Sequence, residues 1–134
     1  MFNSKKLMEQ NLWFCVRCKK HKLKSEFSIR RDKDTNGGWD YNTVCKECLR
    51  NSRLKCEYGI TLEDYNKLFD EQNGCCAICG KHQSEFKRSL AVDHDHNTGK
   101  VRGLLCTPCN NGLGVYEGWS KQFESEIIRY LISK

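Results

Sequence analysis

The chain has 134 residues, of which 10 are cysteines, and its 23 Lys/Arg against 17 Asp/Glu give a formal net charge of +6. Apolar residues make up 38%, and about 30% remains without the cysteines, so burial alone gives a thin core and a further stabilising element, disulfides or metal, is expected. No stretch is typical of a signal peptide or long enough to cross a membrane, which predicts a reducing, intracellular (cytoplasmic) location and argues against a disulfide scaffold.

The positive charge lies in the first half of the chain. Residues 1–58 carry a net charge of +7, whereas residues 59–134 carry −1. Such a bias indicates a polyanionic partner, most often nucleic acid. A solvated basic face that only maintains solubility is the alternative, and charge alone does not decide between the two.

Eight cysteines form four Cys-x-x-Cys pairs, a spacing at which two thiolates can bind one tetrahedral zinc ion. Twenty-six residues separate the first pair from the second, and twenty-six separate the third from the fourth. Two arrangements are possible: consecutive Cys-x-x-Cys pairs share a zinc ion, or the first pair shares one with the last. We expect consecutive pairs to share an ion, because this closes shorter loops. The predicted structural zinc sets are therefore Cys15, Cys18, Cys45 and Cys48 for the first ion and Cys76, Cys79, Cys106 and Cys109 for the second. Cys56 and Cys75 are left over, and buried free thiols are expected there.

Periodicity and turn residues predict the elements between the pairs. Short strands around a turn are expected in 25–42, then a short basic helix that ends near Gly59. A second helix begins after Thr61, carries apolar residues at helical spacing and ends at Asn73-Gly74. A strand, a tight turn and a second strand follow in 89–106, and the last cysteine pair begins a helix. Phe123, Ile127, Tyr130 and Leu131 predict a closing amphipathic helix.

Asp93 and His94 end the first strand of that hairpin, and Asn110 directly follows the last cysteine pair. Hydrolysis of a phosphodiester bond needs a base that deprotonates water and a cation that neutralises the phosphate. A carboxylate and an amide oxygen are hard ligands suited to Mg²⁺ or Mn²⁺, and an imidazole is suited to act as the base. Adjacent strand residues point to opposite faces, so Asp93 and His94 serve one site only if the strand end twists or loops. Taken alone, this pattern is better explained by a polar loop or an extra zinc ligand, but Cys-x-x-Cys pairs flank it on both sides.

The run VDHDHNTGKVRGLLCTPCN, with YGITLEDYNKLFDEQNGCCAICGK before it, resembles the phage recombination endonuclease VII family of His-Me finger (HNH, ββα-metal) nucleases. The resemblance covers about residues 57–134. The segment FCVRCKKHKLKSEF…VCKECLRNSR resembles a zinc ribbon placed ahead of such nucleases. Together they imply a small, zinc-stabilised α+β protein of phage or bacterial origin. Its domains would be a basic zinc-ribbon module, 1–58, and a ββα-metal nuclease domain with structural zinc, 59–134.

The resemblance also implies roles for individual residues. Asp93 and Asn110 become ligands of one catalytic Mg²⁺ or Mn²⁺, and His94 becomes the general base, with His96 as the alternative base. The best-known junction-resolving member of the family has an acidic residue three positions after the metal-binding Asn, where this chain has Leu113. The implied activity is a DNA endonuclease that leaves 5′-phosphate and 3′-hydroxyl ends.

The implied partner is DNA, either duplex or branched. A second copy of the chain, forming a homodimer, is a further candidate partner, and no membrane partner is expected. The residues predicted to contact nucleic acid are basic and lie in the first module or on the hairpin: Lys19, Lys20, Lys22, Arg30, Arg31, Arg50, Arg53, Lys100 and Arg102. The rival function is a non-catalytic zinc module that binds DNA or RNA, because four cysteine pairs and a basic half suit it equally well.

Overall fold

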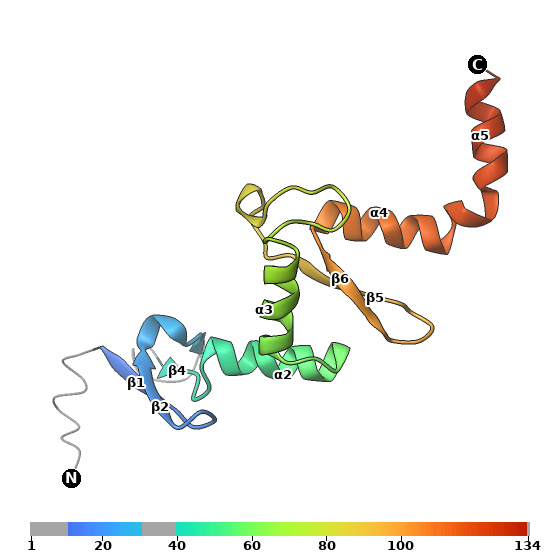
Figure 1. Cartoon of the computed structure of the whole chain (residues 1–134). Coiled ribbons are helices and arrows are strands. Elements are labelled where there is room, and N and C mark those ends of the chain that lie inside the picture. The colour runs from blue at the N-terminus through green and yellow to red at the C-terminus, as the bar shows by residue number, and fades with distance from the viewer. Residues whose placement is uncertain (1–10, 31–39, 134) are drawn as a thin grey trace, which may run out of the picture. The chain divides into compact units, whose positions relative to one another are not determined.

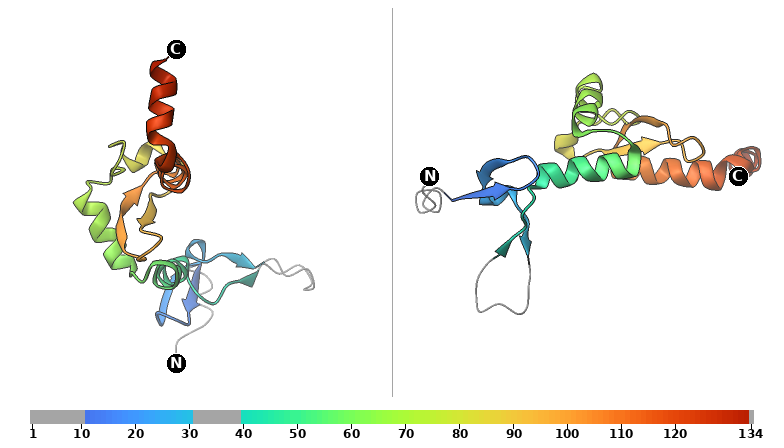
Figure 2. Two further views of the ribbon diagram at one scale, coloured as in Figure 1. Left: turned by 90° about the vertical axis from the view of Figure 1, so that its right-hand side faces the viewer. Right: turned by 90° about the horizontal axis from the view of Figure 1, so that it is seen from below.

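The structure, a computed structural model, describes residues 11–30 and 40–133. The chain divides into two compact units, Met1–Leu62 and Glu63–Lys134. Both units combine small antiparallel sheets with helical structure, which confirms the predicted α+β class (Figures 1 and 2). Among the described residues, no helix is long and apolar enough to span a bilayer.

Residues 11–30 and 40–62 of the first unit form two two-stranded sheets and a long helix. Its elements are β1 (Leu12–Cys15), β2 (Lys20–Leu23), the 3₁₀ turn η1 (Lys24–Glu26), β3 (Ile29–Arg30), β4 (Asp40–Tyr41) and α2 (Lys46–Tyr58). Strand β1 pairs with β2 and β3 pairs with β4, both antiparallel. Helix α2 ends where Gly59 adopts the left-handed conformation, as the sequence predicts.

The core of the first unit is built around its cysteines. Cys15 and Cys45 are fully buried beside Phe27. Partly buried side chains pack against this centre: Trp13, Cys18, Tyr41, Val44 and Cys48. Since cysteines supply so much of this core, the stability of the unit depends on the link between their sulfur atoms.

The second unit contains one hairpin with helices before and after it. Its elements are α3 (Leu62–Glu71), η2 (Gln83–Glu85), β5 (Ala91–His94), β6 (Val101–Leu105), α4 (Thr107–Gly118), η3 (Ser120–Phe123) and α5 (Glu124–Ile132). Strands β5 and β6 are antiparallel, and α4 follows β6 directly and packs against β5, so hairpin and helix form a ββα unit (Figure 1). Leu90, Val92 and Leu104 are buried at its centre.

The predicted basic helix, the helix after Thr61, the hairpin and the two C-terminal helices are all present. The β1–β2 hairpin around the first cysteine pair was not predicted, because KHKL lacks the apolar alternation of a half-buried strand. Phe123 lies in η3, ahead of the closing helix, and most of the apolar residues of α5 are exposed. The turn-rich part of the predicted strand region, 31–39, lies outside the described residues.

Candidate active site and zinc centres

The sulfur atoms of each predicted zinc set lie within 4.8 Å of one another. Cys15 Sγ and Cys48 Sγ are 3.9 Å apart, as are Cys79 Sγ and Cys106 Sγ. A tetrahedron with Zn–S bonds of about 2.3 Å has sulfur–sulfur edges of about 3.8 Å, so this spacing fits zinc. All ten cysteines are free thiols. The consecutive pairing is therefore confirmed, and the two clusters fit two structural zinc ions.

The first pair of each set lies in the same kind of backbone turn. Lys19 N–H donates to Cys15 O and Gly80 N–H donates to Cys76 O, both at 2.9 Å. Lys19 and Gly80 each directly follow the second cysteine of a pair and have positive φ, 58° and 70°. This turn brings the two sulfur atoms of a pair to one side.

The second pair of each set begins a helix. Cys45 and Cys106 are the N-cap residues of α2 and α4. Leu49 N–H donates to Cys45 O at 3.0 Å, and Asn110 N–H donates to Cys106 O at 2.9 Å. Asn110 and Leu49 are thus equivalent positions in the two modules. The first module has an apolar side chain at this position, whereas the second has a side-chain amide, the oxygen donor predicted from the sequence.

Backbone N–H groups favour a thiolate at one cysteine of each set. Burial opposes ionisation of Cys15, but N–H groups of Cys18, Cys45 and Arg17 lower its pKa to about 6. Cys76 is similar: burial raises its pKa, but backbone N–H groups lower it to about 6. Both environments suit thiolates that bind zinc.

The hairpin that carries Asp93 and His94 contains a β-bulge. Asp93 is opposite Gly103, but His94 is opposite Val101, so Arg102 is the extra residue on β6. A bulge bends its strand, increases the local twist and re-aims side chains. Asp93 and His94 are adjacent in the strand, so their side chains can face the same side only where the strand is irregular, and the bulge lies at that point. Asp93 is buried, with 9% of its surface exposed, and His94 is half-buried.

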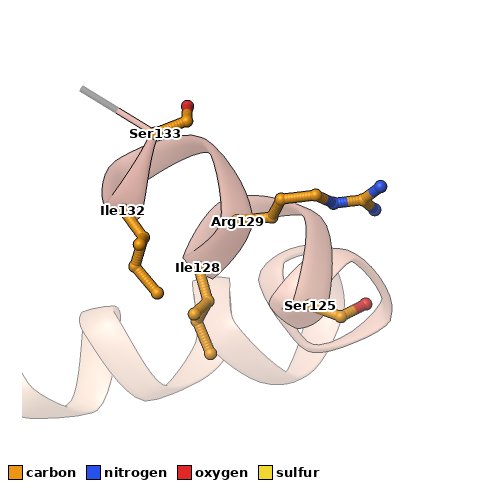
Figure 3. Close-up of a pocket in the computed structure, with 5 residues that line it drawn as sticks. All are labelled: Ser125, Ile128, Arg129, Ile132 and Ser133. Carbon is orange, nitrogen blue, oxygen red and sulfur yellow. The ribbon is translucent and has the colours of Figure 1, made fainter.

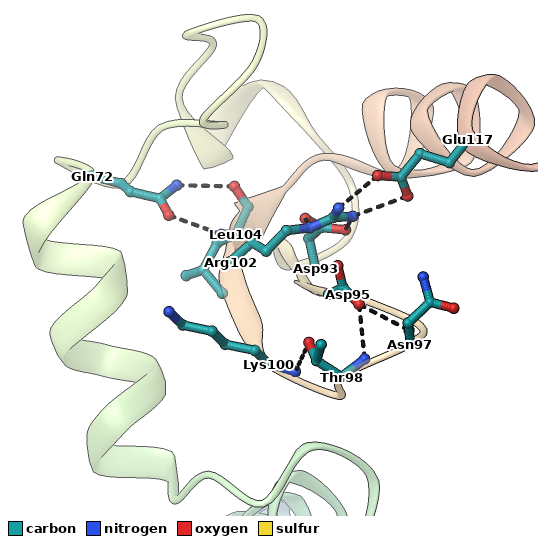
Figure 4. Close-up of polar contacts among 9 residues, drawn as sticks. All are labelled: Gln72, Asp93, Asp95, Asn97, Thr98, Lys100, Arg102, Leu104 and Glu117. Carbon is teal, nitrogen blue, oxygen red and sulfur yellow. Dashed lines mark hydrogen bonds and ion pairs between the residues drawn. The ribbon is translucent and has the colours of Figure 1, made fainter. Parts of the chain in front are cut away.

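The loop after this strand is fixed by Asp95 (Figure 4). Its Oδ1 accepts hydrogen bonds from Asn97 N and Thr98 N, both at 2.8 Å, and Asp95 N–H donates to Lys100 O at 2.9 Å. The N–H groups of Thr98 and Asn97 lower the pKa of Asp95 below its usual value. Asn97 is accordingly part of the turn.

Arg102 lies between two carboxylates (Figure 4). Its Nε and Nη2 donate to Asp93 Oδ2 and Oδ1 at 2.7 and 2.9 Å. Its Nη1 and Nη2 donate to Glu117 Oε1 and Oε2 at 2.6 and 3.2 Å. The hydrogen bonds to Asp93 and then Glu117 raise the pKa of Arg102, and the bond from Arg102 lowers the pKa of Glu117. Arg102, predicted to contact nucleic acid, is exposed and forms ion pairs with both carboxylates in this structure.

Glu117 was not among the predicted site residues. It lies at the end of α4, seven positions after Asn110. Seven residues are close to two helical turns, so Asn110 and Glu117 share one face of α4. Leu113, three positions after Asn110, stands about one turn before Glu117. The i, i+7 spacing from Asn110 was the sequence signal that could have identified Glu117.

The two candidate bases lie together. The rings of His94 and His96 have their centroids 4.9 Å apart and are inclined by 32°. His94 is half-buried and His96 is exposed. His96 makes a small contribution to the lowered pKa of Glu117, so its ring lies within electrostatic range of that carboxylate.

The side chains of Asp93 and Asn110 both offer oxygen donors, the kind that a hard cation prefers. In this structure the Arg102 guanidinium is the cation that lies on both Asp93 oxygens. Asn110, half-buried in the first turn of α4, offers an amide oxygen from the helix that packs against β5. Oxygen donors of this kind suit Mg²⁺ or Mn²⁺.

The basic residues of the first unit differ in their partners. Lys19, Lys20 and Arg30 are exposed. Lys22 is half-buried and bonded to Glu47, with Glu26 at 3.6 Å, and the bond to Glu47 raises its pKa. Two further predicted contacts, Arg50 and Arg53, lie exposed on α2, and Lys100 is exposed in the hairpin loop. Arg31 lies outside the described residues.

Two further features lie apart from these sites. A shallow hollow on α5 is lined by Ser125, Ile128, Arg129, Ile132 and Ser133, none of which is a predicted site residue (Figure 3). Of the two remaining cysteines, Cys56 is exposed on α2 and Cys75 is half-buried. The expectation that both thiols are buried was therefore wrong; Cys56 falls on the polar side of a helix whose one buried residue is Leu54.

Residues 51–133 match the recombination endonuclease VII family, and the chain belongs to that family. It is 38% identical over 97 residues to the gene 59 protein of Mycobacterium phage L5, covering 70% of this chain and 57% of that protein. It is 47% identical over 70 residues to the gene 59 protein of Mycobacterium phage D29, covering 52% and 40%. The chain thus spans about half the length of these relatives.

Among solved structures, the chain is similar to the ββα-Me type II restriction endonuclease Hpy99I. The two are 29% identical, with a TM-score of 0.34, over 92% of this chain and 66% of that one.

Proposed function

We propose that this protein is a metal-dependent endonuclease that hydrolyses phosphodiester bonds in DNA. The observation that carries the proposal is the ββα unit of a chain in the recombination endonuclease VII family: its bulged hairpin bears Asp93 and His94, and the helix packed on it bears Asn110. The zinc cluster fixes the start of that helix, so it also fixes Asn110. The protein acts inside the cell, where reducing conditions keep its thiols available for zinc.

Asp93 and Asn110 would hold one Mg²⁺ or Mn²⁺ through oxygen atoms. When bound, such an ion neutralises charge on the scissile phosphate and stabilises the departing oxygen. His94 takes a proton from water, and the resulting hydroxide attacks phosphorus. The bond from phosphorus to the 3′ oxygen breaks and that oxygen takes a proton from solvent, which leaves 5′-phosphate and 3′-hydroxyl ends. His94 is preferred to His96 because it lies in the strand next to Asp93, whereas His96 lies in the exposed loop.

The basic first unit would bind the DNA. Lys19 and Lys20 are exposed beside the first zinc set, where Lys19 N–H donates to Cys15 O and Lys20 begins β2. Contacts from such residues to phosphate give affinity without sequence specificity. The substrate is duplex or branched DNA, and a homodimer would place two such units on it.

The experiment is a cleavage panel with the zinc-loaded protein. Supercoiled plasmid, linear duplex, four-way junction, single-stranded DNA and RNA are each incubated with Mg²⁺, with Mn²⁺ and with excess chelator that spares the zinc, and the product ends are mapped. Divalent-ion-dependent cutting that leaves 5′-phosphates supports the proposal. Tight binding to DNA or RNA with no cleavage under any condition would instead support the non-catalytic zinc module.

A further inference from the structure

The guanidinium of Arg102 occupies the carboxylate that the proposed function assigns to a divalent ion. Both Asp93 oxygens accept from it, through Nε at 2.7 Å and Nη2 at 2.9 Å. Asp93 is 9% exposed, so the carboxylate end of this ion pair is largely shielded from water, whereas the Arg102 side chain is 33% exposed. The hydrogen bonds between the two side chains are charge-assisted. An incoming cation therefore meets an Asp93 that already has a positive partner.

Glu117 gives the same guanidinium a second place to bind. Nη1 donates to Glu117 Oε1 at 2.6 Å, and Nη2 is shared, since it also reaches Glu117 Oε2 at 3.2 Å. Asp93 is therefore held by two hydrogen bonds, one from Nε and one from Nη2. Those two bonds can be given up while Nη1 and Nη2 stay on Glu117, so a small rotation of the side chain frees Asp93 without leaving the arginine unpaired.

We propose that Arg102 is the resident counter-cation of Asp93 in the metal-free protein and that Glu117 retains Arg102 when a divalent ion takes its place. Arg102 and Glu117 are then positioning residues that set the affinity of the metal site. This inference rests on the proposed function, in that Asp93 is taken as the ligand of the divalent ion.

The opposite signs of two substitutions follow from this arrangement. Arg102→Gln removes the competing charge, so the divalent ion binds Asp93 more tightly. Glu117→Gln leaves a displaced Arg102 without its carboxylate and next to a dication, so the ion binds more weakly. Neither effect requires Glu117 to touch the metal.

The test is Mn²⁺ binding to the zinc-loaded, full-length protein without DNA, followed by electron paramagnetic resonance of the free ion. Asp93→Asn gives the background from other acidic groups. Relative to wild type, Arg102→Gln is expected to bind Mn²⁺ on the order of tenfold more tightly, a typical size for coupled binding equilibria. Glu117→Gln is expected to bind several-fold more weakly. Zinc content and far-ultraviolet circular dichroism of each variant check folding. Because the Glu117 side chain is exposed on α4, Glu117→Gln is expected to fold, and it tests the proposal even if Arg102→Gln does not fold.

The double variant distinguishes positioning from direct ligation. With Arg102 already replaced by Gln, Glu117→Gln is expected to change the Mn²⁺ affinity by less than about twofold, because the two substitutions act through one interaction. An equal loss in both backgrounds would make Glu117 a metal ligand or a simple through-space charge and would overturn the proposal. An unchanged affinity in Arg102→Gln overturns it as well. If wild type and Asp93→Asn bind Mn²⁺ identically, the metal assignment of the proposed function fails, and this inference fails with it.

Discussion

The side-chain amide of Gln72 forms a two-way hydrogen bond with the backbone of Leu104 (Figure 4). Its Nε2 donates to Leu104 O at 2.9 Å, and its Oε1 accepts from Leu104 N at 2.8 Å. The same Nε2 donates to Cys75 O at 2.8 Å. One side chain thus joins the end of α3, the start of the third cysteine pair and the strand β6 that leads into α4.

Gln72→Ala is expected to lower the free energy of unfolding by about 1–3 kcal/mol, because it leaves backbone groups of β6 without their partners. Chemical denaturation at a fixed zinc concentration measures the change. Glu71→Ala, the exposed neighbour on α3, is the control and should cost less than about 0.5 kcal/mol. Equal stability of the two variants would show that solvent replaces the Gln72 bonds without cost.

The two clusters predict two zinc ions per chain, bound so that their removal unfolds the protein. Structural zinc contributes its binding free energy to folding, and here the cysteines form much of a small core. Elemental analysis gives the count, and circular dichroism during chelation reports unfolding. Cys106→Ser should lose one zinc ion, while Cys56→Ser, an exposed cysteine outside both clusters, should keep two. Loss of zinc from Cys56→Ser would contradict the assignment.

The two neighbouring histidines predict unequal losses of activity. His94→Ala should reduce cleavage by roughly 10²–10⁴-fold, the usual contribution of a positioned general base. His96→Ala is the matched control, because its ring lies beside that of His94 but in the exposed loop. Single-turnover cleavage rates with equal DNA occupancy make the comparison. A dead His96→Ala with an active His94→Ala would reverse the assignment.

The basic residues of the first unit predict different contributions to DNA binding. Lys19→Ala with Lys20→Ala should weaken binding and flatten the slope of log affinity against log salt by up to about 0.9 per lost phosphate contact. Lys22→Ala should change the slope less, since Lys22 is bonded to Glu47 and half-buried. Fluorescence anisotropy with duplex DNA over a salt series measures both. Equal salt slopes for wild type and the Lys19/Lys20 variant would show that these two lysines do not contact the DNA phosphates.

The sequence by itself determined the features that depend on short spacing. A Cys-x-x-Cys pair brings two sulfur atoms together within one turn, so each zinc set followed from two such pairs and the loop between them. The helix after Thr61 and the hairpin before Cys106 followed from periodicities that are local to each element. The same local reasoning failed for β2, because a polar strand carries no periodic signal.

Only the tertiary structure decided the electrostatic partners around Asp93. The sequence placed Asp93 and His94 side by side, but the bulge that admits Arg102 depends on how two strands align, which no single strand encodes. Glu117 lies fifteen residues after Arg102 in the chain, and the two side chains meet because α4 packs against β5. Lys22 and Glu47 are likewise joined across twenty-five residues. Charge pairs at such separations are set by packing, and packing is a property of the folded chain.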